Sequence, residues 1–178
     1  MALMHAVSHG QKDALKILLD IYMPVVSRVT YRILCDQAES DEVTRRIFVR
    51  IWNDAPWADG RSGGEIWIYR TACRMCRGRI FRRKILDLLS ISPSLYETSA
   101  PYADEDDFIT KEAWEIFCRA SRNMSSWERI VYSLCDLEEL PMSVVREVTG
   151  MSAARIHDRL HMAREKLKSE LEIYGKVR

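Results

Sequence analysis

The stretch MSVVREVTGMSAARIHDRLHMAREKL, residues 142–167, decides the fold of the C-terminal part of the chain. A short helical segment, Met142–Thr149, ends at Gly150, and Ser152 is placed to cap a longer helix. The apolar residues of that longer helix recur at helical spacing: Ile156, Leu160, Ala163, Leu167 and Leu171. A short helix, a glycine turn and a capped helix indicate a helix-turn-helix, although a generic hairpin of two helices gives the same pattern.

Two further helices are predicted upstream of this stretch. Ser125 or Ser126 can cap one of them, with Glu128 in its first turn. Its apolar positions are Trp127, Ile130, Val131, Leu134 and Leu137. The other helix is indicated by Ala113, Ile116, Phe117 and Ala120.

The N-terminal part predicts three helices. Apolar residues from Leu15 to Ile33 follow helical spacing, and Pro24 among them predicts a kink or a new start. Ser40 or Asp41 is expected to cap the second helix, which turns Val43, Ile47 and Ile51 towards the core.

The third N-terminal helix begins near Glu65 and carries two stripes. The apolar stripe consists of Ile66, Tyr69, Cys73, Cys76 and Ile80. Arg70, Arg74 and Arg77 form a basic stripe about a quarter turn away. Because Cys73 and Cys76 fall on the apolar stripe, we expect small core residues there rather than a zinc site or a reactive thiol pair.

Composition and charge complete the expected organisation. The chain has 178 residues with only 7 Gly and 5 Pro, which favours helices, and its net charge of +1 conceals a basic, an acidic and a mildly basic block. The predicted fold class is all-α: two small helical domains, 1–89 and 111–178, joined by a flexible acidic linker, 90–110. Five cysteines, no bilayer-spanning run and no signal-peptide core predict a cytosolic protein without a disulfide framework.

Several stretches resemble the sigma-70 family of bacterial RNA polymerase sigma factors, in its extracytoplasmic-function (ECF) group. Residues 142–167 and the preceding SSWERIVYSLCDLEELP, 125–141, resemble the region 4 helix-turn-helix. Residues 18–34 (LLDIYMPVVSRVTYRIL), 40–52 (SDEVTRRIFVRIW) and 65–84 (EIWIYRTACRMCRGRIFRRK) resemble region 2. The order of the two modules and the position of the linker also agree with the family.

This resemblance implies an alternative sigma factor that directs core RNA polymerase to promoters and initiates transcription. Its implied partners are core RNA polymerase and promoter DNA, with an anti-sigma protein as a candidate, and it implies no membrane insertion, catalytic residue, cofactor or metal.

Three sets of residues would carry that function. The recognition helix would read the promoter −35 element through Arg155, His157, Asp158, Arg159, His161 and Met162. Aromatic and arginine side chains would bind the −10 element and open the strands: Trp57, Arg61, Trp67, Arg70, Arg74 and Arg77. Core polymerase would bind Glu42, Arg45, Arg46 and Val49. A surface charge is the plainer alternative for Arg155, core packing for Trp67, and a solvated face for the polymerase-binding set.

Two other classes of function stay open at this point. Arg45, Arg46 and Arg74 replace residue types common in the family, which suggests a sigma-like DNA- or protein-binding regulator that has lost initiation activity. An enzyme, such as a thiol oxidoreductase using Cys73 and Cys76, is disfavoured by their place on the apolar stripe and by the lack of a paired acid–base constellation.

Overall fold

The computed structural model describes residues 3, 6–7, 9–54, 64–89 and 111–177, and the predicted linker lies outside them. Helices account for nearly all of these residues, and no strand occurs among them, which confirms the all-α prediction. The elements are α2 (Lys12–Leu34), α3 (Gln37–Asp54), α4 (Gly64–Leu88), α5 (Lys111–Arg122), α6 (Ser126–Tyr132), a π-helical turn η1 (Ser133–Leu137), α7 (Met142–Thr149) and α8 (Ala153–Val177). No helix of the described part is long and apolar enough to cross a bilayer.

The N-terminal helices α2, α3 and α4 pack on one another through the predicted apolar positions. Ile33, Ile47, Ile51, Cys76 and Ile80 are completely or almost completely buried there. Pro24 lies inside α2, which runs through it, so no new helix starts at that point.

The predicted cap of α3 is wrong. The helix begins at Gln37, and the Asp36 carboxylate accepts a hydrogen bond from the Glu39 backbone N–H at 2.9 Å. Ser40 is instead buried in the second turn, with its hydroxyl 2.8 Å from the Thr30 hydroxyl of α2. The Ser40 hydroxyl is engaged by Thr30 on a neighbouring helix, so Asp36 caps α3 in its place.

The C-terminal helices follow the predicted pattern closely. Ser125 caps α6 in a capping box with Glu128, and Gly150 ends α7 in the left-handed conformation, with φ 71°. Ile130 of α6, Leu134 of η1 and Ile156 of α8 are completely buried. The predicted helix from Trp127 to Leu137 ends in the π-helical turn η1, where the Glu138 N–H bonds the Ser133 carbonyl at 2.9 Å.

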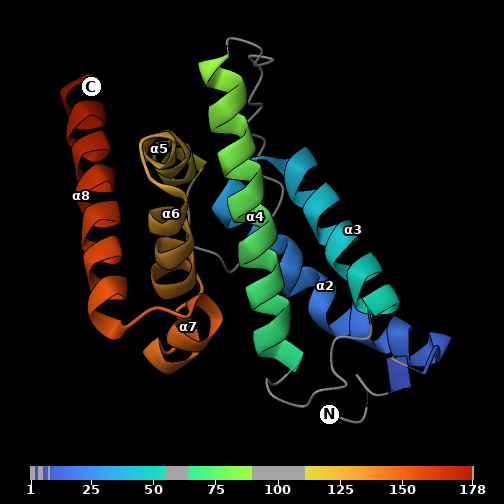
Figure 1. The fold of residues 1–178 in the computed structure, drawn as a ribbon. Helices are drawn as coiled ribbons and strands as arrows, with labels where there is room; N and C mark the ends of the chain where they lie inside the picture. Colours follow the sequence, from blue (N-terminus) through green and yellow to red (C-terminus); the bar gives the residue numbers. More distant parts are fainter. Residues whose placement is uncertain (1–2, 4–5, 8, 55–63, 90–110, 178) are drawn as a thin grey trace.

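The two halves of the molecule are in direct contact. α4 stands between α2 and α3 on one side and α5 to α8 on the other (Figure 1). One continuous cluster of buried side chains includes Ile68 and Cys73 of α4 together with Ile130 of α6 and Val145 of α7. The division into domains 1–89 and 111–178 therefore stays a prediction about the chain, and both parts share one core.

Candidate nucleic-acid and polymerase interfaces

The helix-turn-helix places α8 through a short series of local bonds. The Gly150 N–H donates to the Arg146 carbonyl at 2.8 Å and closes α7. The Ser152 hydroxyl accepts the Arg155 N–H at 3.4 Å, as the sequence predicts for a cap. Val145 and Ile156 are buried between the helices, so the turn fixes how α8 projects.

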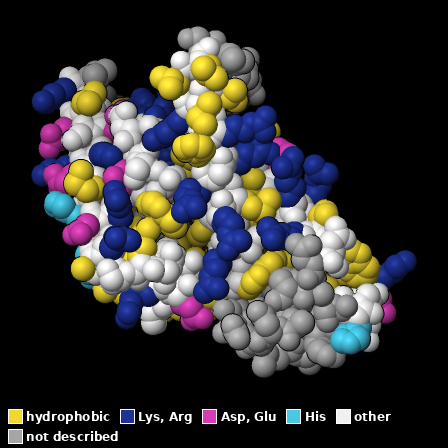
Figure 2. Space-filling model, in the orientation of Figure 1, with side chains coloured by type: hydrophobic (Ala, Val, Ile, Leu, Met, Phe, Trp, Pro, Cys, Tyr) yellow, Lys and Arg dark blue, Asp and Glu magenta, His cyan; other side chains and the backbone are white. Residues whose placement is uncertain are grey.

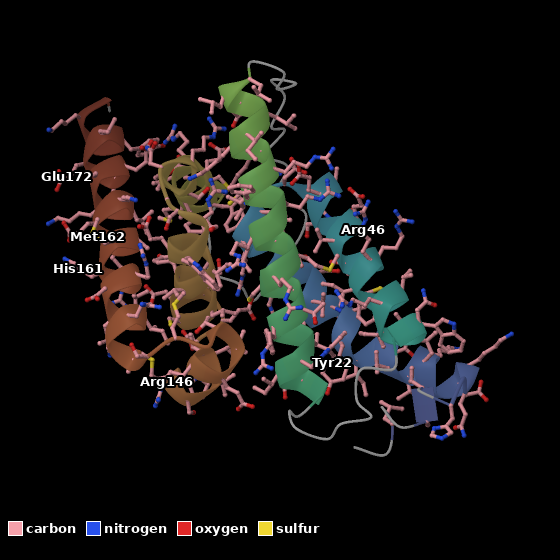
Figure 3. The ribbon with its side chains drawn as sticks, viewed as in Figure 1. Tyr22, Arg46, Arg146, His161, Met162 and Glu172 are labelled. Carbon is pink, nitrogen blue, oxygen red and sulfur yellow. The ribbon has the colours of Figure 1, made fainter. Side chains whose placement is uncertain are left out.

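The outward face of α8 holds most of the predicted −35 set. Arg155, His157, Asp158, His161 and Met162 are all exposed. His161 and Met162 lie on the outer side of α8 and point away from the other helices (Figure 3). This face therefore presents hydrogen-bond donors, hydrogen-bond acceptors and one apolar side chain, which are the groups that contact base edges.

Arg159 differs from the rest of that set, because it turns back towards the protein. Its guanidinium is 3.8 Å from the Glu128 carboxylate, and it is only partly exposed. The same carboxylate binds Lys166 of α8 at 2.6 Å and accepts the Ser125 N–H at 2.8 Å. Burial works to raise the pKa of Glu128, but the bonds from Lys166 and Ser125 outweigh it and lower the pKa below the usual value. Glu128 thus links α6 to α8 through charged contacts, beside the apolar packing of the two helices.

The predicted basic stripe lies along α4. Figure 2 shows Lys and Arg side chains gathered over this helix in the middle of the view. Arg74 and Arg77 are exposed, whereas Arg70 is half-buried. Arg70 donates to the Glu147 carbonyl of α7 at 2.8 Å, and the Arg77 guanidinium lies 4.7 Å from the centre of the Trp127 ring of α6. Two of the three arginines therefore contact the C-terminal half.

The aromatic members of the predicted −10 set are less informative. Trp67 is partly buried and packs against the main core, which agrees with the alternative of core packing. Trp57 and Arg61 lie outside the described residues.

The predicted polymerase-binding residues share the outer face of α3. Arg45, Arg46 and Val49 are exposed, while Glu42 is partly buried and forms ion pairs with Arg79 of α4 and with Arg46, the latter at 2.5 Å. Arg46 projects from α3 on the side away from the C-terminal half (Figure 3). Burial tends to raise the pKa of Glu42, but Arg79 and Arg46 outweigh it and lower the pKa.

An apolar groove that the sequence analysis missed runs beside this face, between α2 and α3. Its volume is about 620 Å³, and Arg45 and Val49 line it together with Leu19, Met23 and Trp52. Val49 is 52% exposed, although it is a large apolar residue. α2 leaves the large apolar residues Ile17, Ile21 and Met23 exposed, and Met23, which lines the groove, is the signal that could have indicated it.

A charged cluster between the halves was also missed. Glu138, which follows η1, accepts hydrogen bonds from Arg28 at 3.0 Å and Arg32 at 2.8 Å, both on α2. The Glu138 side chain is 3% exposed and that of Arg32 is 8% exposed, so this is a buried ion pair. Arginines four residues apart on an apolar helix signal a buried acid, but nothing local to them identifies it as Glu138.

Cys73 and Cys76 are buried, as predicted. Burial raises the pKa of Cys73 to about 12 and raises the pKa of Cys76 well above its usual value, so both thiols stay protonated near neutral pH. In the described ranges, no three His, Cys, Asp or Glu side chains gather as a metal site.

Comparisons with known proteins bear on the whole chain. No model of a known protein family matches it. Over 173 residues it is 22% identical to a Bacillus subtilis (strain 168) protein, "ECF RNA polymerase sigma factor SigW", which covers 93% of this chain and 92% of that one. The fold is similar to that of CnrH, solved in complex with the cytosolic domain of CnrY, with a TM-score of 0.66, 17% identity and 97% and 96% of the two chains covered. The predicted family resemblance and the all-α fold are confirmed.

Proposed function

Because the chain is homologous to an ECF RNA polymerase sigma factor over nearly its whole length, we propose that it is an alternative sigma factor with three separate working surfaces. The homology supports the function in promoter-specific transcription initiation. The observation that carries the assignment to surfaces is the exposed face of α8, which the helix-turn-helix holds outwards. Core polymerase and promoter DNA are its partners, which makes the bacterial cytoplasm its place of action and requires no catalytic step of the chain itself.

The −35 surface is the outer face of α8. Arg155 lies in the first turn of the helix, where recognition helices contact base edges, and its side chain is exposed. His157, Asp158, His161 and Met162 extend the surface along the helix, whereas Arg159 acts mainly by holding α8 on Glu128.

The −10 surface is the basic stripe of α4. In the described part of the chain no side chain pairs with Arg74, so its guanidinium is available to a phosphate or an unstacked base. Arg70 and Arg77 would join it once their contacts with α7 and α6 are released.

The polymerase surface combines the outer face of α3 with the adjacent groove. Arg45, Arg46 and Val49 present charge beside exposed apolar area, which is the composition of a protein–protein interface. The groove would receive an apolar ridge of core polymerase, and Glu42 would keep α3 fixed to α4 through Arg79.

The decisive experiment is transcription from genomic DNA fragments with purified core polymerase, with and without the chain. We expect new start sites that depend on the chain and share −35 and −10 sequences. Co-elution with core but no transcripts would point to a missing activator or to defective strand opening. If the chain neither co-elutes with core nor yields transcripts, the sigma assignment is rejected in favour of the sigma-like regulator.

Single substitutions test the three surfaces in the same assay. Arg155→Ala should lower promoter affinity by about 1–3 kcal/mol, while Lys168→Ala, an exposed cation further along α8, should change it little. Arg74→Ala should retain closed-complex binding and lose strand opening.

Val49→Asp should abolish co-elution with core polymerase, whereas Ile85→Asp, which changes an exposed apolar residue on α4 outside the groove, should not.

A further inference from the structure

Two cysteines from the two halves of the chain meet beside α5. Cys35 is the residue after α2, and Cys118 lies within α5. Both cysteines are buried in one cluster of packed side chains and line the same cavity. Ser121 lies next to both: its hydroxyl oxygen is 3.5 Å from the Cys35 sulfur and donates to the Cys118 carbonyl at 2.8 Å. Cys35 and Cys118 are therefore neighbours in the fold, although they lie far apart in the sequence.

Aromatic side chains pack beside the two cysteines. Trp114 of α5 donates a hydrogen bond to the Tyr31 hydroxyl of α2 at 2.9 Å, and the two rings stack with centroids 5.0 Å apart. Phe117 packs against Trp114 in the same cluster, which also contains both cysteines. These aromatic contacts join Tyr31 of α2 to α5 next to the two cysteines.

A cavity gives small molecules access to the sulfurs. Its volume is about 160 Å³, and both cysteines line it together with Arg83, Arg122 and Arg129. A cavity of this size holds several molecules as small as water. Its cationic wall favours a thiolate over a thiol.

The two sulfurs have unequal acidity. The hydrogen bond from Cys118 is the largest influence that lowers the pKa of Cys35, and Ser121, Arg129 and Arg83 add to it against the effect of burial. Donating that bond raises the pKa of Cys118, and burial raises it further. Cys35 is therefore the better nucleophile, and Cys118 is placed to react with it afterwards.

We propose that Cys35 and Cys118 are a peroxide-sensitive pair that forms a disulfide between the two halves of the molecule. The Cys35 thiolate attacks hydrogen peroxide: an S–O bond forms, the O–O bond breaks, and the departing hydroxide takes up a proton to become water. The Cys118 thiol then gives up its proton and attacks the Cys35 sulfenic acid, so that an S–S bond forms and the S–O bond breaks with loss of a second water. Two thiols are oxidised and one peroxide is reduced to two waters.

The bridge would fix α5 to the end of α2. With the two halves in contact, which we call the closed arrangement, Arg70 contacts α7 and Arg77 contacts α6. An oxidised chain held in this arrangement keeps part of the basic stripe covered. On the proposed function, on which this consequence rests, peroxide would lower promoter-dependent transcription and a dithiol reductant would restore it.

The bridge is tested first without polymerase or DNA. The reduced full-length chain is treated with hydrogen peroxide, alkylated, digested and analysed by mass spectrometry. We expect a linked Cys35–Cys118 peptide that dithiothreitol removes, with Cys73 and Cys76 alkylated as free thiols. Absence of the linked peptide, or equal oxidation of all cysteines, would overturn the proposal.

Variants identify the order of the two steps. Cys118→Ser should stop the bridge and leave Cys35 as a sulfenic acid that dimedone labels, whereas Cys35→Ser should abolish both the bridge and the label. Cys135→Ser, which changes a cysteine outside the cavity, should behave like the unchanged chain. Thermal melts followed by circular dichroism verify the fold, and the alanine substitution at the same position replaces any serine variant that fails to fold.

The transcription assay then separates this inference from the proposed function. Peroxide should suppress transcripts from the unchanged chain but not from Cys35→Ser. If the bridge forms and the reduced chain directs no transcription, the disulfide stands and the sigma function fails. If transcripts appear and no bridge forms, the sigma function stands and the disulfide proposal fails.

Discussion

Glu128 shows how much one side chain contributes to the placement of the recognition helix. Its carboxylate completes the cap of α6 and binds Lys166 of α8 at 2.6 Å, with the side chain 6% exposed. Glu128→Ala should therefore lower the free energy of unfolding by about 2–4 kcal/mol, since it removes a cap and charged hydrogen bonds from a buried position. Urea denaturation would measure the loss. Glu165→Ala, at an exposed position on α8, is the control and should change stability by less than about 0.5 kcal/mol.

The contribution of Glu128 to stability depends on pH, because the pKa of its carboxyl group is lowered in the folded protein. A carboxylate whose pKa is lower in the folded protein contributes stability above its unfolded pKa and loses it as the pH falls through the folded pKa. The difference in stability between the unchanged chain and Glu128→Gln should accordingly be largest near neutral pH and shrink below about pH 4.5. A difference that stays constant down to pH 3 would contradict the role of the charge.

At the scale of an element, two glycines make a matched pair. Gly150 ends α7 with φ 71°, whereas Gly78 lies exposed inside α4, and a Cβ atom added at either would meet nothing within 4 Å. Gly150→Ala should cost about 1 kcal/mol through backbone strain alone. Gly78→Ala should instead stabilise the protein by about 0.5–1 kcal/mol, because alanine favours a helix interior. Equal effects of the two substitutions on urea denaturation midpoints would contradict this account.

The helix ends also show what could be predicted from sequence. Gly150, Ser152 and Ser125 act within a few residues of themselves, so spacing was enough to locate them. Ser40 was misplaced because its hydroxyl bonds Thr30 on another helix. The exposed face of α8 followed from periodicity, but the turn of Arg159 towards Glu128 did not, since it depends on how α6 and α8 pack.

At the scale of the whole molecule, the contact between the halves could not be predicted. Glu138 binds Arg28 and Arg32, and Cys35 and Cys118 line one cavity, across large separations in the chain. No periodicity within either half identifies such partners. In the sequence, α4 is far from the C-terminal helices. In the structure, α4 packs against α6 and α7.

This closed arrangement predicts that the free chain limits its own affinity for DNA. Glu138→Gln removes the carboxylate that binds Arg28 and Arg32 of α2. An open form, in which the two halves have separated, should therefore become more populated. Each ~1.4 kcal/mol taken from the closed form should raise the apparent affinity for single-stranded promoter DNA about tenfold. Glu139→Gln, at the exposed neighbouring position, should leave the affinity unchanged. Small-angle scattering should show larger dimensions for Glu138→Gln alone, and an expanded variant with unaltered affinity would mean that the contact does not cover the DNA-binding face.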